Sequence, residues 1–323
     1  MFLDNEMCPC NSGLKVAECV CKSNSFIPVA AKTTPRLPIT GNRVRGCYAA
    51  DTQDCDGGLT REHPLSTAVL KVLSRGENAI SVTNHPWQKE KLVPKRVGIK
   101  GLSKYSLCER HNHALSPLDT IAGRFVTALL DCTRHVVTAS PGRFHRLFNG
   151  FDIERWMLKV LCGVQFDKRL QRHSWRDRWK PPLEWLSILF NGDAFPPGCG
   201  MYCRKKHQHR PIAGCSIYVQ TRFATLYPTN SAQRTSFVPP TWKVVVGVEI
   251  TLFDLELCLF MVPVPNLNEF SYRTSMHRFF NDDRRDRCAE LHLHWAGMLP
   301  SLAGVVGRDE LQICVSRPNE TKN

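Results

Sequence analysis

The spacing of apolar residues along this chain changes near residue 200. Before that point, apolar residues recur at every third or fourth position in two stretches, 115–130 and 151–190, and this spacing predicts helices. After it, β-branched and aromatic runs bounded by Pro, Gly and Asn predict strands over 216–219, 242–250, 255–262 and 311–315. The pattern therefore predicts an α+β protein, with a helical segment followed by a mixed α+β C-terminal domain.

The distribution of cysteines and prolines divides the chain further. Residues 1–22 form a compact cysteine-rich unit, and residues 46–135 hold a second Cys/His group that ends in a helical stretch. Between them, residues 23–45 carry Ser, Thr, Pro and cations without apolar periodicity, which is typical of a linker. We expect residues 136–323 to form the helical segment and the C-terminal domain.

The composition is that of a globular, cytoplasmic protein. The chain has 323 residues, of which 42% are hydrophobic and 22% charged, and it contains no apolar run long enough to span a bilayer. Its first residues, MFLDNE, lack the basic start and the apolar stretch of a secretory signal. In a reducing compartment, the clusters among its 15 cysteines favour metal binding over disulfides.

The charge favours a polyanionic partner. The formal net charge is +14 and the isoelectric point is near 9.3. Cationic side chains release counterions from phosphate backbones, so nucleic acid, with DNA favoured, is the expected partner. The alternative is a basic protein that binds nothing specific.

The first cysteine group, CPCNSGLKVAECVC over residues 8–21, has the spacing of a zinc knuckle. Two cysteines separated by one residue can hold an ion from a tight turn, and two more return after a short loop. Four thiolates satisfy tetrahedral zinc, and the metal would allow so short a segment to fold. The expected ligands are Cys8, Cys10, Cys19 and Cys21.

This segment resembles the SEC-C motif, a small zinc knuckle found in many bacterial proteins. The matching residues are Cys8, Pro9, Cys10, Ser12, Gly13, Lys15 and Cys19. The segment departs from the motif at Asn11, which replaces a glycine, at Val16, which replaces an aromatic residue, and at Cys21, which lies one place late. The resemblance implies a docking knuckle that binds a protein partner.

The second group combines GCYAADTQDCDGGLTREH over residues 46–63 with LCERHNHALSPLD over residues 107–119. Cys47 and Cys55 flank a polar turn, while Cys108 and His111 lie three residues apart at the start of a helix, where both side chains point the same way. Two ligands from a turn and two from a helix start predict a structural zinc site of treble-clef type.

Arg61-Glu62-His63-Pro64, beside this Cys/His frame, resembles the HNH (ββα-metal) nuclease family. The resemblance implies that Glu62 holds a divalent ion such as Mg²⁺, that His63 is the general base, and that Asn112 is a further ion ligand. A neutral imidazole can take a proton from water near pH 7, and an oxygen-bound ion can stabilise phosphorane charge. Either Arg61 or Lys104 could contact phosphate.

The resemblance to HNH nucleases is incomplete. The middle Asn or His of the family has no convincing counterpart, and the distance from His63 to Cys108 along the chain is long. The function predicted first is metal-dependent endonuclease activity on phosphodiesters. The alternatives are a non-catalytic zinc protein that binds nucleic acid, in which His63 is a buried or zinc-supporting residue, and a protein-interaction adaptor.

Overall fold

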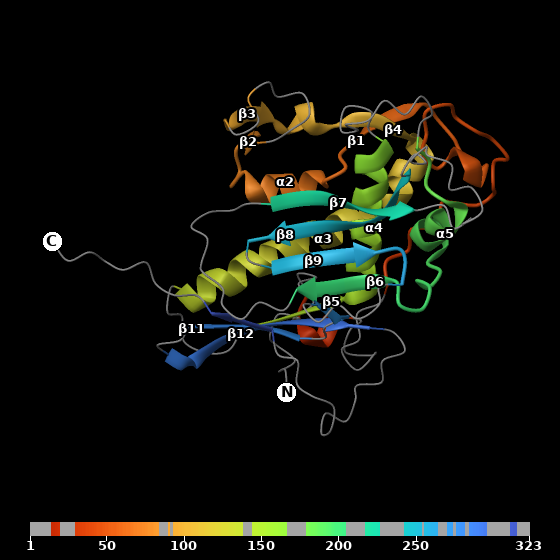
Figure 1. Ribbon diagram of the computed structural model, residues 1–323. Helices are drawn as coiled ribbons and strands as arrows, with labels where there is room; N and C mark the ends of the chain where they lie inside the picture. Colours follow the sequence, from red (N-terminus) through yellow and green to blue (C-terminus); the bar gives the residue numbers. More distant parts are fainter. Residues whose placement is uncertain are drawn as a thin grey trace, which may run out of the picture.

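The computed structural model has a mixed α+β architecture built around two helices that lie against each other, α3 and α4 (Figure 1). On one side, α4 packs on a five-stranded sheet, and on the other, α3 packs on a four-stranded sheet. Two short antiparallel strand pairs lie near the start of α3 and beside α2. The described residues are 14–19, 30–83, 90, 93–137, 144–166, 179–204, 217–226, 242–253, 255–263, 270–273, 276–281, 284–295 and 311–314.

The predicted helices are confirmed, with longer bounds for the first. The helix expected over 115–130 is α3, Glu109–Val137, which continues through Pro117. The stretch 151–190 contains α4, Gly150–Phe166, and α5, Leu183–Asn191. Helix α4 is covered from several sides, so every residue of its predicted apolar face is fully buried. These residues are Ile153, Trp156, Met157, Val160 and Leu161. The remaining α-helix in the described part of the chain is α2, Thr67–Leu73.

Three of the four predicted strands belong to the five-stranded sheet, whose strand order is β10-β6-β9-β8-β7. All four neighbouring pairs are antiparallel. The pattern located the three longest of these strands, because each contains a run of β-branched, aromatic or other apolar residues, although it predicted only the first part of β7. The strands are β6, Gly200–Arg204; β7, Ile217–Leu226; β8, Trp242–Leu252; β9, Leu255–Phe260; and β10, Phe270–Tyr272.

The second large sheet was only partly predicted. Its order is β13-β11-β12-β5, in which β11 and β12 are antiparallel and the two outer strands pair in parallel. The strand expected over 311–315 is β13, whereas the other three carry many charged and polar residues and were not among the main predicted strands. Their bounds are β5, Phe144–Asn149; β11, Met276–Asn281; β12, Arg284–His294; and β13, Leu311–Cys314.

Two small strand pairs belong to residues 46–135, called the zinc module below. β1, Leu59–Glu62, pairs antiparallel with β4, Lys104–Cys108, and α3 begins at the next residue. The chain between β1 and β4 holds α2, then the hairpin of β2, Ala79–Val82, and β3, Lys95–Gly98, and finally the 3₁₀-helix η3, Ile99–Leu102. We call residues 67–102 the basic arm. Figure 1 shows its hairpin at the edge of the molecule.

The zinc module and the C-terminal half share one hydrophobic core. It runs from Cys47 through α3 and α4 to Trp295, across the boundary expected near residue 135. The described part of the expected linker is also attached to this body. Asp152 accepts hydrogen bonds from the backbone N–H of Ala31 at 3.1 and 3.0 Å, and the buried Thr33 hydroxyl contacts the carbonyl of Leu189.

No helix in the described part of the chain is long and apolar enough to cross a membrane.

Candidate metal centre and its surroundings

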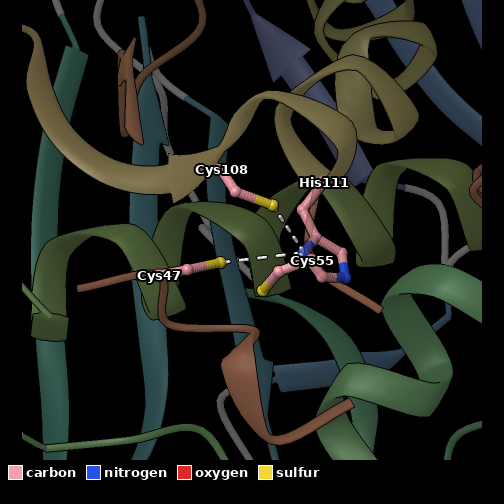
Figure 2. Close-up of side chains that lie close together, drawn as sticks. All are labelled: Cys47, Cys55, Cys108 and His111. Carbon is pink, nitrogen blue, oxygen red and sulfur yellow. Dashed lines mark hydrogen bonds between the residues drawn. The ribbon is translucent and has the colours of Figure 1, made fainter. Parts of the chain in front are cut away.

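Four side chains from three parts of the zinc module converge on one point (Figure 2). Cys47 and Cys55 lie on the loop before β1 and flank the 3₁₀-helix η2, Ala50–Thr52. Cys108 is the last residue of β4, and His111 lies in the first turn of α3. All four side chains are buried, and their ligand atoms lie within 4.8 Å of one another. The predicted Cys/Cys/Cys/His group is therefore assembled in the structure.

The spacing of these atoms fits a tetrahedral zinc ion. His111 Nδ1 lies 3.1 Å from Cys108 Sγ, 3.7 Å from Cys47 Sγ and 3.8 Å from Cys55 Sγ. Zinc bonds of roughly 2.3 Å to sulfur and 2.0–2.1 Å to nitrogen, at tetrahedral angles, separate sulfur from nitrogen by about 3.6 Å. The group can therefore hold a metal ion, and its donor set is typical of structural zinc.

Hydrogen bonding prepares His111 to donate its lone pair from Nδ1. The Thr52 hydroxyl donates to the carbonyl of Ala49 at 2.8 Å, so its oxygen is left to accept from His111 Nε2 at 3.1 Å. This contact places the ring proton on Nε2 and leaves Nδ1 as a ligand. Thr52 lies in the sequence between the two loop cysteines, so the loop that supplies two thiols also orients the imidazole.

The electrostatics of the cluster favour a thiolate at Cys108. A hydrogen bond from the Cys47 thiol, helped by the backbone N–H of His111, lowers the pKa of Cys108 to about 3 against the opposing effect of burial. The same hydrogen bond to Cys108, together with burial, raises the pKa of Cys47. Burial raises the pKa of Cys55. Because a metal binds thiolates, ion binding here must displace protons from Cys47 and Cys55.

The loop after Cys55 is held against the start of α3. The backbone N–H of Glu109 donates to the carbonyl of Gly58 at 3.0 Å, and that of Arg110 donates to the carbonyl of Asp56 at 3.3 Å. Gly57 lies between these contacts with φ +68, and a Cβ at this position would lie 2.9 Å from the Cβ of Glu109. A glycine is therefore required for the loop to approach the helix closely enough to bring its thiols to His111.

Glu62 is turned into the protein. Its side chain is buried, and its carboxylate accepts a hydrogen bond from the Ser106 hydroxyl at 2.5 Å and lies 3.4 Å from Lys159 Nζ. Lys159 also lies 2.6 Å from the carboxylate of Asp119. Burial alone lowers the pKa of Lys159, but Asp119 and Glu62 together more than offset it, so this pKa is raised. Glu62 therefore belongs to a charge cluster, Glu62–Lys159–Asp119, in which Glu62 and Lys159 are buried and Asp119 is partly exposed.

His63 lies half-buried at the end of β1, and both of its nitrogens have partners. Nε2 lies 3.0 Å from the carbonyl of Ile99, and Nδ1 lies 2.9 Å from the hydroxyl of Thr67. A carbonyl can only accept, so the ring proton is on Nε2 and Nδ1 accepts from Thr67. Burial, aided by the charge of Lys159, lowers the pKa of His63 below its usual 6.5. His63 is thus a neutral imidazole that does not belong to the Cys/His group.

The residues expected to bind an oxygen-liganded ion do not fit such an ion. An ammonium group, that of Lys159, already lies beside the Glu62 carboxylate, and a divalent cation there would be repelled by it. Asn112 directs its amide N–H to the Thr60 hydroxyl at 3.0 Å. Within the described ranges, Cys47, Cys55, Cys108 and His111 are the only set of three or more Cys, His, Asp or Glu side chains that could share an ion.

The two residues expected to contact phosphate differ in exposure, since Lys104 is buried and Arg61 is exposed. Lys104 is buried, and its ammonium donates to the carbonyl of Gly163, so the structure excludes it as a surface contact. Arg61 is exposed and lies beside Tyr105. The difference arises because successive residues of a strand point to opposite faces, and the residues neighbouring Arg61 and Tyr105 face the core.

The sequence analysis did not identify Asp119, which is partly buried, or Lys159, which is fully buried. Asp119 ends the LSPLD segment, and its carboxylate accepts from the Ser66 hydroxyl at 2.7 Å. An acidic residue on the buried side of a predicted helix is a signal that could have identified it. Lys159 lies within an apolar helix and gave no signal, since its partners come from other elements.

Most of the first predicted zinc group lies outside the described residues. Cys8, Cys10 and Cys21 are not described, whereas Cys19 is buried beside the 3₁₀-helix η1, Val16–Glu18. The predicted SEC-C knuckle therefore stays a prediction.

Comparisons with protein-family models, with curated proteins and with solved structures found no match. The resemblances to the HNH family and to the SEC-C motif accordingly rest on the motifs alone.

Proposed function

We propose that this chain is a nucleic-acid-binding protein whose zinc module presents the binding surface. The observation that carries the proposal is the charge of the basic arm, which β4 connects to the Cys/His centre. The sequence of residues 67–102 has a large excess of cations, and its only acidic residues are Glu77 and Glu90. The cations are Lys71, Arg75, Lys89, Lys91, Lys95, Arg96 and Lys100.

The described cations of the arm lie at the surface. These residues are all exposed: Lys71 on α2, Arg75 in the turn after it, Lys95 and Arg96 on β3, and Lys100 on η3. One ion pair offsets part of this charge, since Arg96 lies 2.6 Å from Glu77. An exposed cationic surface attracts phosphate backbones because its binding releases condensed counterions. Nucleic acid is thus the ligand whose charge matches the arm.

The Cys/His centre would contribute by fixing the base of the arm. The arm lies between β1 and β4 in the sequence. Strand β4 ends at the ligand Cys108, and α3 begins at the next residue. A metal ion bound by the four side chains would hold the loop before β1 to the β4–α3 junction. The arm would then project from a rigid base, which lowers the entropy lost when it binds a ligand.

The proposal is tested by fluorescence anisotropy with labelled DNA and RNA oligonucleotides over a range of salt concentrations. We expect the logarithm of the binding constant to fall linearly with the logarithm of salt concentration, as phosphate contacts require. The variant Lys95→Glu/Lys100→Glu should bind weakly, whereas Lys32→Glu, an exposed lysine outside the arm, should bind like the unmodified protein. Absence of salt-dependent binding would favour the adaptor function instead.

A second candidate function is HNH-type phosphodiester hydrolysis, and one observation favours it. The carbonyl of Ile99 leaves the lone pair of His63 on Nδ1, and burial keeps the ring neutral near pH 7. A neutral, oriented imidazole is what a general base requires. In this candidate, His63 would accept a proton from water once water replaced the Thr67 hydroxyl. The buried Glu62 carboxylate would position β1.

Plasmid cleavage assays with Mg²⁺, Mn²⁺ or Ni²⁺ test this second candidate. His63→Ala should abolish cleavage, because it removes the base. Thr67→Val, which removes the hydroxyl that competes for Nδ1, should retain it. Cleavage by both the unmodified protein and His63→Ala, or by neither, would exclude His63 as the base and leave the binding function.

A further inference from the structure

An arginine and a tyrosine form an exposed pair on the ribbon of β1 and β4. Arg61 is the cross-strand partner of Tyr105, after a bulge between Thr60 and Arg61 shifts the register. Arg61 Nε donates to the Tyr105 hydroxyl at 3.3 Å, and its guanidinium carbon lies 5.6 Å from the ring centroid. Tyr105 is 59% exposed, more than Tyr218 at 50% or Tyr272 at 38%.

The strands of this ribbon are anchored on their opposite face. Three of the four residues next to the pair in sequence are buried: Glu62, Lys104 and Ser106. Their hydrogen bonds and ion pairs hold both strands to the core, through Glu62 to Lys159 and through Lys104 to the carbonyl of Gly163. The exposed pair is therefore presented by a fixed backbone, and a ligand that binds it need not order the strands first.

The chemistry of the pair suits a nucleic-acid base. An aromatic ring offers a flat apolar surface, and a guanidinium can stack on a base or bond to a phosphate. Because Arg61 satisfies the tyrosine hydroxyl, the exposed ring remains as an apolar face next to a positive charge. A nucleotide presents the complementary combination, because its base has a flat apolar face and its phosphate carries a negative charge.

The position of the pair agrees with the basic arm. The arm begins after His63 and returns through η3 into β4, which carries Tyr105. A nucleic-acid strand whose phosphates contact the exposed cations of the arm, such as Lys100, can therefore continue toward the β1–β4 pair. In a duplex both faces of an internal base are covered by neighbouring bases. Only an unpaired base has a face free to stack on Tyr105.

We propose that Arg61 and Tyr105 form a stacking site for an unpaired base, and that the ligand of this protein is single-stranded nucleic acid. The inference rests on the proposed nucleic-acid binding and specifies its ligand. The arm supplies phosphate contacts, and the pair supplies the preference for single strands.

The test measures anisotropy with a labelled oligothymidylate of about twenty nucleotides, longer than the roughly 4–16 nucleotides of common single-strand sites. A duplex of the same length serves as the second ligand. The variants Tyr105→Ala, Tyr105→Phe and Tyr218→Ala are prepared in a His63→Ala background, in buffer without divalent cations, so that cleavage cannot affect the readout. Circular dichroism melting confirms that each variant is folded.

We expect the single strand to bind at least about tenfold more tightly than the duplex, and Tyr105→Ala to lose roughly tenfold in single-strand affinity. Tyr105→Phe should bind more tightly than Tyr105→Ala, since the ring is kept, and Tyr218→Ala should bind like the parent because it alters an exposed tyrosine on another element. Equal binding of both ligands, or an unchanged affinity of folded Tyr105→Ala, would overturn the inference while leaving nucleic-acid binding intact. Failure to bind either ligand at low salt would overturn both and would indicate a protein partner.

Discussion

His63 and His111 have the same protonation pattern but different surroundings. Each places Nε2 against an oxygen, the Ile99 carbonyl or the Thr52 hydroxyl, and so keeps a lone pair on Nδ1. At His111 that lone pair meets three cysteine side chains, and the four residues together could hold a metal ion. At His63 it meets one hydroxyl, that of Thr67. The groups that surround Nδ1, and not the residue type, therefore decide which histidine can be a metal ligand.

The first prediction concerns the pH dependence of His63. Its pKa in the folded protein is lowered below 6.5 by burial, so the folded state binds fewer protons than the unfolded state. The stability that neutral His63 contributes is present above pH 6.5 and is lost as pH falls through the lowered pKa. NMR titration of the imidazole should give a midpoint below 6.5. Urea unfolding at about pH 7.5 and about pH 5.5 should show a smaller loss of stability for His63→Gln than for the unmodified protein.

The second prediction concerns the hydrogen bond that orients His111. Thr52→Val removes the acceptor at Nε2 and should weaken zinc binding about 10- to 100-fold, the usual cost of losing such a partner. Competition with a chromogenic zinc chelator measures the change. Thr67→Val, which alters the partner of His63 instead, is the matched control. Equal zinc affinities for the two variants would mean that Thr52 does not set the ligand geometry.

At the scale of elements, α4 joins the parts of the molecule through buried ion pairs. Asp152 and Arg155 contact the segment around residues 31–33, and Glu154 pairs with Arg273 after β10 at 2.9 Å. Lys159 pairs with Glu62 of β1 and Asp119 of α3. A buried charge is costly unless it is paired, so each of these contacts specifies which element packs on which side of α4.

A test of the Lys159 contacts is the third prediction. Lys159→Met leaves the buried Glu62 carboxylate and the partly exposed Asp119 carboxylate without their cation and should lower the free energy of unfolding by about 3–5 kcal/mol. Adding Glu62→Gln should recover part of that loss, because it removes one unpaired charge. Lys180→Met, which breaks an exposed pair with Asp51, should cost about 0–1 kcal/mol. Urea denaturation of the four proteins gives these values, and equal costs for Lys159→Met and Lys180→Met would refute the role of burial.

The fourth prediction concerns the contact between α2 and α3. A Cβ at Gly123 would lie 2.6 Å from the Cβ of Ala68, so the two helices approach too closely for two methyl groups. Gly123→Ala should destabilise the protein by roughly 1–3 kcal/mol through overpacking, despite the higher helix propensity of alanine. Ala68→Gly introduced with it should restore much of the stability. A stabilising effect of Gly123→Ala alone in thermal unfolding would contradict this packing.

At the scale of the whole molecule, the Cys/His centre lies within the shared core. All four of its side chains are buried, and the ring of His111 lies 4.8 Å from that of Phe190 on α5. A change at the centre therefore reaches the C-terminal half, and we expect metal loss to affect the cooperative unfolding of the whole chain.

The fifth prediction is the zinc content. Elemental analysis should find two zinc ions per chain, one at the Cys/His centre and one at the predicted SEC-C knuckle. Cys108→Ser should remove one ion and lower the melting temperature markedly, because the centre lies in the core. Cys8→Ser should remove the other with a smaller effect on melting. A single ion that survives Cys108→Ser would contradict the assignment of the centre.

The sequence by itself determined the helices α3 and α4, the longest strands of the five-stranded sheet, and the four residues of the Cys/His centre. Each of these is encoded by local spacing, either an apolar period or a pair of ligands in one turn. The two ligand pairs could be matched because tetrahedral zinc requires four donors, although more than 50 residues separate them in sequence.

Only the tertiary structure decided the environment of Glu62 and His63, and which of Arg61 and Lys104 is exposed. Whether Glu62 faces an open site or a buried lysine depends on α4, which begins 88 residues later in the chain and shares no local pattern with β1. The same is true of Arg61 and Lys104, since a bulge and the core behind the ribbon determine which faces outward. The local spacing of apolar residues predicts which face of a helix or strand is buried. It does not predict which charged residues contact that face, because those residues come from segments distant in sequence.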